Sequence, residues 1–143
     1  MLDITTKAVA NTAPIHLKDA EGNHMYFGEG EARKPVQIVL YGPGSPQYAE
    51  VEARQTNRAV KRMQDNDGKI AVASPEQRDA EQAEDLAAVT VAFVGFTYPP
   101  AGEAKGAELF RALYADKSLG FITKQVLKAV GDWGKVKSAS PAS

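Results

Sequence analysis

The chain has no cysteine, only two histidines among its 143 residues, and no long apolar run. Without cysteine, disulfide scaffolds, thiolate zinc sites and cysteine nucleophiles are excluded. No stretch reaches the roughly 18 consecutive apolar residues of a membrane-spanning helix, and the N-terminal residues lack the pattern of a signal peptide. Lys and Arg number 17 against 18 Asp and Glu, so no global charge attracts nucleic acid or anionic membrane. We expect a soluble cytosolic protein of single-domain length.

Strand-like segments are concentrated in the first third of the chain. Residues 15–18 and 24–27 flank the turn-forming segment 19–23, which predicts a hairpin. Residues 36–41 form an apolar run rich in β-branched and aromatic side chains, which predicts a third strand. An antiparallel sheet of this kind has one apolar face, so it needs a cover.

The first helix has a clear start. Ser45 is a preferred N-cap residue and Pro46 suits the first helical position, so the helix should begin at Pro46 and end in the turn-forming segment 65–68. At 100° per residue, its small and apolar side chains fall on one side: Tyr48, Ala49, Ala53, Thr56, Ala59, Val60 and Met63. The opposite side is basic: Arg54, Arg58, Lys61 and Arg62. We expect the apolar side to face inward and the basic side to face outward.

Three more helices are predicted after it. Ser74 and Gln77 form a capping box that starts the second helix, and the apolar stretch 86–96 is expected to continue it to Phe96. The segment 97–102 ends it, because it contains two prolines and a glycine. Apolar residues at helical spacing then predict a third helix over about 107–114 and a fourth over about 119–133.

The order of these signals predicts an α+β fold, with a small N-terminal antiparallel sheet of about three strands followed by about four α-helices. We expect an N-terminal arm over residues 1–14 and a single domain over residues 15–136. Its β part should cover residues 15–41 and its helical part residues 45–134. Residues 137–143 are small and polar, which predicts a flexible C-terminal tail.

The sequence contains no convincing catalytic or metal-binding motif. His16 and His24 lie on the two arms of the predicted hairpin near Asp19 and Glu21, so a metal site or a small hydrolase is conceivable. The spacing matches no zinc pattern, and such residues are ordinary in a polar hairpin. We therefore expect no metal, no cofactor and no enzymatic activity. The segment 42–45 resembles a phosphate loop only superficially, since no lysine follows its second glycine, and we interpret it as a helix-capping turn.

The basic side of the first helix has two interpretations. It is either a partner-binding surface or a solvated face neutralised by nearby carboxylates, including those at the start of the second helix. Binding to nucleic acid is not expected, because no aromatic residue is interleaved with the basic ones on that face.

Five segments together resemble the tail assembly chaperones of long-tailed bacteriophages of the siphovirus type. They are HLKDAEGNHMYF, LYGPGSPQY, EARQTNRAVKRM, LAAVTVAFVGF and LYADKSLGFITKQVLKAVGDW. The resemblance covers residues 15–133. It departs from the family at Gly95-Phe96, where Gly-Trp is usual, and at Asp132-Trp133, where Asn-Phe is frequent. Both positions keep a large aromatic side chain.

The resemblance implies a non-enzymatic chaperone that binds and solubilises the tape measure protein and helps recruit tail tube subunits, working as a homo-oligomer in the host bacterial cytoplasm. Such families often make a longer form by ribosomal frameshifting. Our candidate partner-binding residues are basic or aromatic, although the aromatic ones would equally serve the protein's own core: Arg54, Arg58, Lys61, Arg62, Phe96, Tyr114, Phe121 and Trp133. The alternative function is a structural component of the phage particle, such as a minor tail or head protein.

Overall fold

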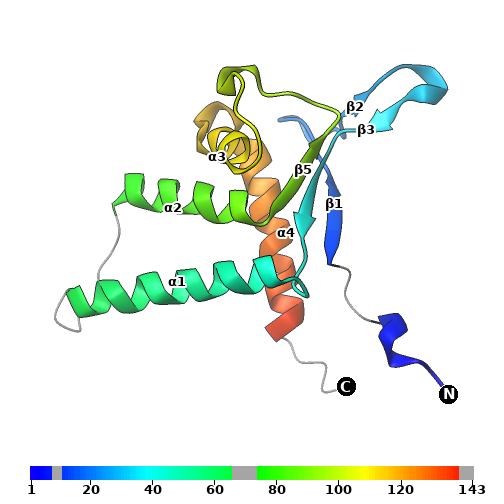
Figure 1. The fold of residues 1–143 in the computed structure, drawn as a ribbon. Helices are drawn as coiled ribbons and strands as arrows, with labels where there is room; N and C mark the ends of the chain where they lie inside the picture. The colour runs from blue at the N-terminus through cyan, green and yellow to red at the C-terminus, as the bar shows by residue number, and fades with distance from the viewer. Residues whose placement is uncertain (8–10, 66–73, 139–143) are drawn as a thin grey trace.

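The computed structural model describes residues 1–7, 11–65 and 74–138, with the backbone alone described for residues 7 and 133–138. Its sheet is three-stranded and antiparallel, with strand order β1-β4-β5. Strand β4 (Gln37–Tyr41) lies in the centre, between β1 (Thr12–His16) and β5 (Thr90–Val94). The fold is α+β, as predicted, but its strands are spread through the chain instead of being confined to the N-terminal part (Figure 1).

The predicted hairpin forms, but its second arm leaves the sheet. Asp19 N–H donates to the Asn23 carbonyl at 2.8 Å and closes the turn, and Lys18 pairs with His24 in an isolated bridge. Strand β2 (Tyr26–Phe27) then pairs with β3 (Lys34–Pro35) in a separate two-stranded ribbon. At the other end, β1 begins at Thr12, inside the segment that the sequence assigned to an N-terminal arm.

The third strand of the sheet comes from the segment that we predicted as the second half of a helix. Helix α2 (Pro75–Ala88) ends well before Phe96, and β5 follows directly after Val89. The prediction was wrong because the segment is rich in β-branched residues, which favour a strand, and the free edge of β4 offers it hydrogen bonds. Tyr41 N–H donates to the Val89 carbonyl at 2.7 Å at the point where the chain enters the sheet.

The predicted helix starts are confirmed. Helix α1 spans Pro46–Asp65, and Ser45 Oγ accepts the Tyr48 N–H at 3.2 Å. Helix α2 begins with the complete capping box of Ser74 and Gln77. Helices α3 (Ala107–Ala115) and α4 (Gly120–Ser138) follow the predicted segments, and α4 extends into the predicted tail. The residues expected to end α1 lie, apart from Asp65, outside the described part of the chain.

The described residues also form short 3₁₀ turns between the helices and strands. They are η1 (Ile4–Lys7), η2 (Gly30–Ala32), η3 (Pro99–Ala101) and η4 (Lys117–Leu119). The turn η3 belongs to the irregular connection between β5 and α3, which arches over one end of the molecule (Figure 1).

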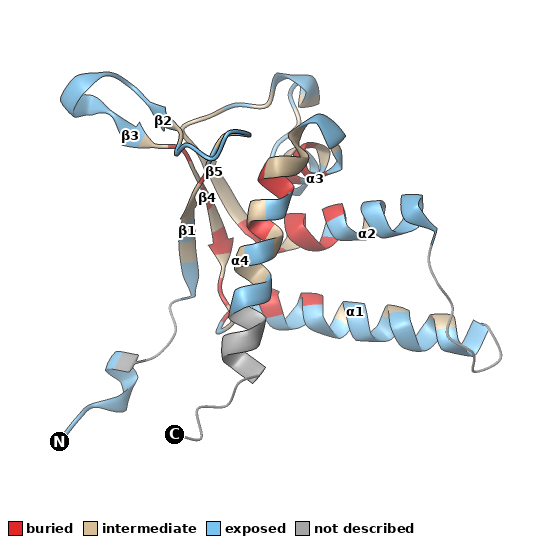
Figure 2. Cartoon of the chain, turned by 180° about the vertical axis from the view of Figure 1, so that it is seen from behind, coloured by how far each residue is buried: buried red, intermediate tan, exposed pale blue. Residues whose placement is uncertain are grey.

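The core lies between one face of the sheet and helices α2, α3 and α4. Ile38 and Leu40 on β4 are fully buried, and they meet Leu86 of α2, Leu113 of α3 and Val126 of α4 in one cluster. Helices α1 and α2 together form a hairpin that extends away from the sheet, which we call the arm (Figure 1). Burial in α1 is restricted to its first turns, whereas α2 is buried in its second half (Figure 2).

Candidate partner-binding surfaces

Three of the four predicted outward basic residues of α1 face α2 instead. Arg58 Nη1 lies 2.9 Å from both carboxylate oxygens of Asp85, and Gln55 Nε2 donates to the same carboxylate at 3.1 Å. Arg54 Nη2 is 3.2 Å from Asp85 Oδ1. Asp85 is 8% exposed, and a buried carboxylate needs such partners because an unpaired charge is costly to bury. The prediction that the basic side faces solvent was therefore wrong for this part of α1.

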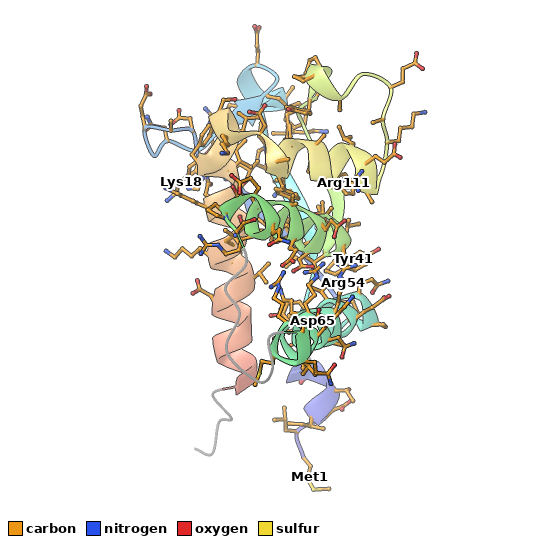
Figure 3. All side chains as sticks on the ribbon, turned by 90° about the vertical axis from the view of Figure 1, so that its left-hand side faces the viewer. Met1, Lys18, Tyr41, Arg54, Asp65 and Arg111 are labelled. Carbon is orange, nitrogen blue, oxygen red and sulfur yellow. The ribbon has the colours of Figure 1, made fainter. Side chains whose placement is uncertain are left out.

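The pairing continues toward the tip of the arm. Arg58 Nη2 lies 3.4 Å from Glu84 Oε2, and Arg62 pairs with Glu81. Arginines spaced four residues apart on α1 thus meet acidic residues three to four apart on the antiparallel helix α2, the spacing that puts each set on one helix face. Figure 3, which labels Arg54, shows side chains of the two helices meeting between them. Lys61 stays exposed. Of the two interpretations of the basic face, neutralisation by α2 is the one that the geometry supports.

Most of the side of α1 that we expected to be buried is exposed; of the residues on that side, Tyr48 alone is buried. Val60 and Met63 are 47% and 45% exposed. The other members of the stripe, which we call the α1 seam, are exposed as well: Ala49, Ala53 and Thr56. What anchors α1 is its first turns, where Val51 is buried and the Tyr48 hydroxyl donates to the Val130 carbonyl of α4 at 3.2 Å. Ion pairs with α2, and not the apolar periodicity of α1, therefore determine which side of this helix faces inward.

A cavity of about 330 Å³ lies between α1, α2 and α4. Apolar side chains line it, Val51, Leu86 and Val130 among them, and its charged lining includes Arg62, Arg78 and Glu81. The Arg–carboxylate pairs close part of this space, so we assign it a structural role in holding the arm together.

Of the predicted aromatic residues, Tyr114 belongs to the buried core. Tyr114 is 6% exposed, and its hydroxyl lies 2.7 Å from Thr90 Oγ1. Thr90 Oγ1 also donates to the Leu86 carbonyl at 2.7 Å, so the Tyr114 hydroxyl is the donor in their shared bond. Burial raises the pKa of Tyr114 to about 12. Phe96 and Phe121 are half-buried against the core, and the side chain of Trp133 lies outside the described part of the chain.

Phe96 lines an apolar groove of about 530 Å³ between β5, the irregular connection after it and α3. The Phe96 and Phe93 rings are stacked with centroids 4.8 Å apart, and Leu109 of α3 lines the same groove. The irregular connection forms one side of the groove, which Ala104 and Lys105 line. We call this feature the β5 groove. The groove brings Phe96, a predicted partner-binding residue, together with Phe93, Leu109, Ala104 and Lys105, which the sequence did not identify as candidates.

A hydrogen bond and a close steric contact hold the first part of the connection, which forms a wall of the β5 groove. The Tyr98 hydroxyl donates to Asp116 Oδ2 at 2.7 Å, and this bond raises the pKa of Tyr98. Hydrogen bonds from Ser118 and from Tyr98 lower the pKa of Asp116. Directly after β5, Gly95 adopts φ +83°, and a Cβ there would overlap the Phe27 ring. These contacts fix the segment that follows β5 although it has no regular structure.

The two histidines do meet across the hairpin. Their rings stack with centroids 4.2 Å apart, and His16 Nε2 is 2.9 Å from the Met25 carbonyl oxygen. Among the residues that the structure describes, no group of three or more His, Cys, Asp or Glu side chains is placed to hold a metal ion. The pair packs as aromatic rings, and Tyr26 adds an edge contact with His16 at 4.8 Å.

The comparisons with known proteins give no family. No protein-family model, curated protein sequence or solved structure matches this chain. Within the described ranges, no helix is long and apolar enough to cross a membrane.

Proposed function

We propose that this protein is a phage tail assembly chaperone, a non-enzymatic factor that binds the tape measure protein, keeps it soluble and helps recruit tail tube subunits around it. The proposal rests on the sequence resemblance, and the observation that supports it best is the β5 groove. A long helical client displays apolar side chains along one face, and an open apolar groove on a rigid scaffold is a common site for such side chains.

The chemistry of the β5 groove suits this role. Its floor is apolar and aromatic, with Phe93, Phe96 and Leu109, and aromatic side chains are enriched in protein-protein interfaces. Lys105 lies among the lining residues and is exposed, which provides a polar edge next to the apolar floor. Arg54, Arg58 and Arg62 are engaged with α2, so we place the client on the β5 groove and not on the basic side of α1.

Co-expression tests the proposal. The chain is produced together with the tape measure protein of the same phage, and the soluble yield of that protein is measured. We expect wild type to raise it and Ala104→Trp, which fills the β5 groove without removing a core side chain, to abolish the gain. Ala115→Trp places the same ring on an exposed position at the end of α3, outside the groove, and should behave as wild type. An unchanged soluble yield with wild type would overturn the proposal.

The alternative, a structural component of the particle, makes the opposite prediction for the finished virion. Mass spectrometry of purified particles should not detect a chaperone that leaves after assembly, whereas a minor tail or head protein would be present at a fixed copy number. Detection at such a copy number would replace our proposal with the alternative.

A further inference from the structure

Strand β5 is an edge strand of the sheet, and its outer edge is free to form hydrogen bonds. Tyr41 N–H donates to the Val89 carbonyl at 2.7 Å, so Tyr41 and every second residue before it on β4 turn their backbone groups toward β5. The residues opposite these on β5 are Ala92 and Val94. Phe93 lies between them, so its N–H and C=O point to the outer edge, where the described residues provide no hydrogen-bond partner.

The opposite edge of the sheet, formed by β1, is blocked against a further strand. Leu17 N–H donates to the Val36 carbonyl at 2.9 Å, so by alternation Ile15 also turns its backbone groups toward β4. Pro14 then occupies an outward position, and proline has no N–H to donate. Strand β5 contains neither proline nor a charged residue, which are common protections of an open edge. Of the two edges, β5 is therefore the one that can accept another strand.

The β5 groove lies along this open edge. Ala92 and Phe93 both line it, although the side chains of neighbouring strand residues point to opposite faces of a sheet. What the two residues share is the edge of the strand. Leu109 and Phe110 of α3 also line the groove. A segment that lies in the groove therefore has unpaired backbone groups on one side and apolar side chains on the other.

We propose that the β5 groove receives a short extended segment of the client, which pairs with β5 as a fourth strand; this rests on the proposed function, which places the client on the same groove. A helix satisfies its own backbone groups, so a helix lying over the edge would bury the N–H and C=O of Phe93 without partners. An extended segment bonds both of them. Strand β5 has five residues, so a segment of about five residues is sufficient, and the rest of a long client can stay helical.

The lining of the groove indicates which side chains the bound segment carries. The Phe93 ring lies on the helix-covered face of the sheet, with its centroid 4.7 Å from that of Phe110. Every second residue of an added strand lies on this same face, beside Phe96 and Leu109, and should be apolar. Among the described residues that line the groove, Lys105 alone is charged, and an acidic residue at the nearby end of the segment complements it. The expected occupant thus has alternating apolar residues and an acidic residue at one end.

Synthetic peptides test the conformation of the bound segment. Overlapping peptides that cover the tape measure protein of the same phage are screened against the full chain by fluorescence polarisation. Each backbone nitrogen of the tightest binder is then methylated in turn. We expect methylation at every second position to weaken binding about tenfold, because it removes a hydrogen bond to the edge of β5, and the positions between to tolerate it. Equal sensitivity at all positions, as a bound helix would show, or the absence of any binding peptide would overturn the proposal.

The Phe93 amide and the Lys105 side chain provide readouts on the protein. In NMR of the isotope-labelled chain, the peptide should slow solvent exchange of the Phe93 amide about tenfold or more. Lys105→Glu should weaken binding of a peptide with the acidic residue about fivefold, whereas Lys128→Glu, at an exposed position of α4 outside the groove, should bind as wild type does. A Phe93 amide that the peptide leaves unprotected, or that is already protected by pairing between two copies of the chain, would overturn the proposal.

The co-expression assay separates this inference from the proposed function. If wild type raises the soluble yield of the tape measure protein but no peptide shows the alternating pattern, strand pairing is wrong and the proposed function stands. If the soluble yield is unchanged, the proposed function fails whatever the peptides do.

Discussion

The substitution Asp85→Asn tests most directly whether the basic side of α1 faces α2. The Asp85 side chain is 10% exposed and faces Arg58, Arg54 and Gln55 from α1. Removing its charge leaves two guanidinium groups near a carboxamide that donates as well as accepts. If α1 had its basic side in solvent, as its sequence pattern predicts, the substitution would have almost no effect.

The expected magnitude follows from the burial of the partners. Breaking a buried ion pair by removing one partner costs roughly 3–5 kcal/mol. The Arg58 and Arg54 side chains are 20% and 41% exposed, so water screens part of the interaction. We therefore expect a loss at the low end, about 3 kcal/mol, out of a total stability of about 5–15 kcal/mol.

Urea unfolding followed by circular dichroism measures this loss. With a slope of about 2 kcal/mol per molar urea, the midpoint should fall by about 1.5 M. Asp79→Asn makes the same change at an exposed position of α2 and should cost less than about 0.5 kcal/mol. Replacing both partners, as in Asp85→Leu with Arg58→Met, should recover most of the loss because no buried charge stays unpaired. Equal stability of Asp85→Asn and wild type would refute the arrangement described here.

Three further predictions concern the core, the β5 groove and a helix start. Burial raises the folded pKa of Tyr114 to about 12, above the unfolded value of about 10, so the folded state holds the proton longer and stability falls as pH rises from about 10 to 12. In alkaline unfolding experiments Tyr114→Phe should remove this part of the pH dependence, and an unchanged slope would contradict the assignment. Gly95→Ala should cost about 2 kcal/mol in urea unfolding, because φ is +83° there and the added Cβ meets Phe27; a neutral effect would contradict that contact. Ser74→Ala should lower stability by about 1 kcal/mol through loss of the α2 N-cap, and Ser74→Asp, which keeps an acceptor, should restore it.

Local chemistry predicted the helix starts correctly, because a cap involves residues that are neighbours in the sequence. Ser45 beside Pro46 starts α1, and Ser74 with Gln77 starts α2, as expected. The α+β class was also predictable from the distribution of strand-like and helical patterns along the chain. These features need no knowledge of which segments meet in space.

The rotation of α1 could not be predicted in this way. Apolar periodicity assigns the inner side of a helix on the assumption that burial of apolar surface dominates. Here Asp85 and Glu81 of α2 pair with Arg58 and Arg62, and these ion pairs determine which side of α1 faces α2. The sequence pattern of α1 alone does not indicate this pairing. The sequence did suggest the acidic residues of α2 as neutralising partners of the basic side, but not that this pairing would turn that side of α1 toward α2.

The strand β5 and the β5 groove depended on tertiary structure as well. A short apolar run such as residues 86–96 fits a buried helix or a strand by hydrophobicity alone, and its β-branched residues were the signal that favoured a strand. The groove forms where an irregular connection passes beside Phe96. Its position depends on the bond between Tyr98 and Asp116, which joins residues distant in sequence.

Hydrogen exchange on the complex with the tape measure protein tests the central claim most directly. The amides of the full chain are followed by mass spectrometry alone and in the complex. If the β5 groove holds the client, protection should increase in segments 91–98 and 102–110, and Ala104→Trp should prevent it. Protection that is absent there, or that is confined to the arm, would contradict the assignment of the client to this groove.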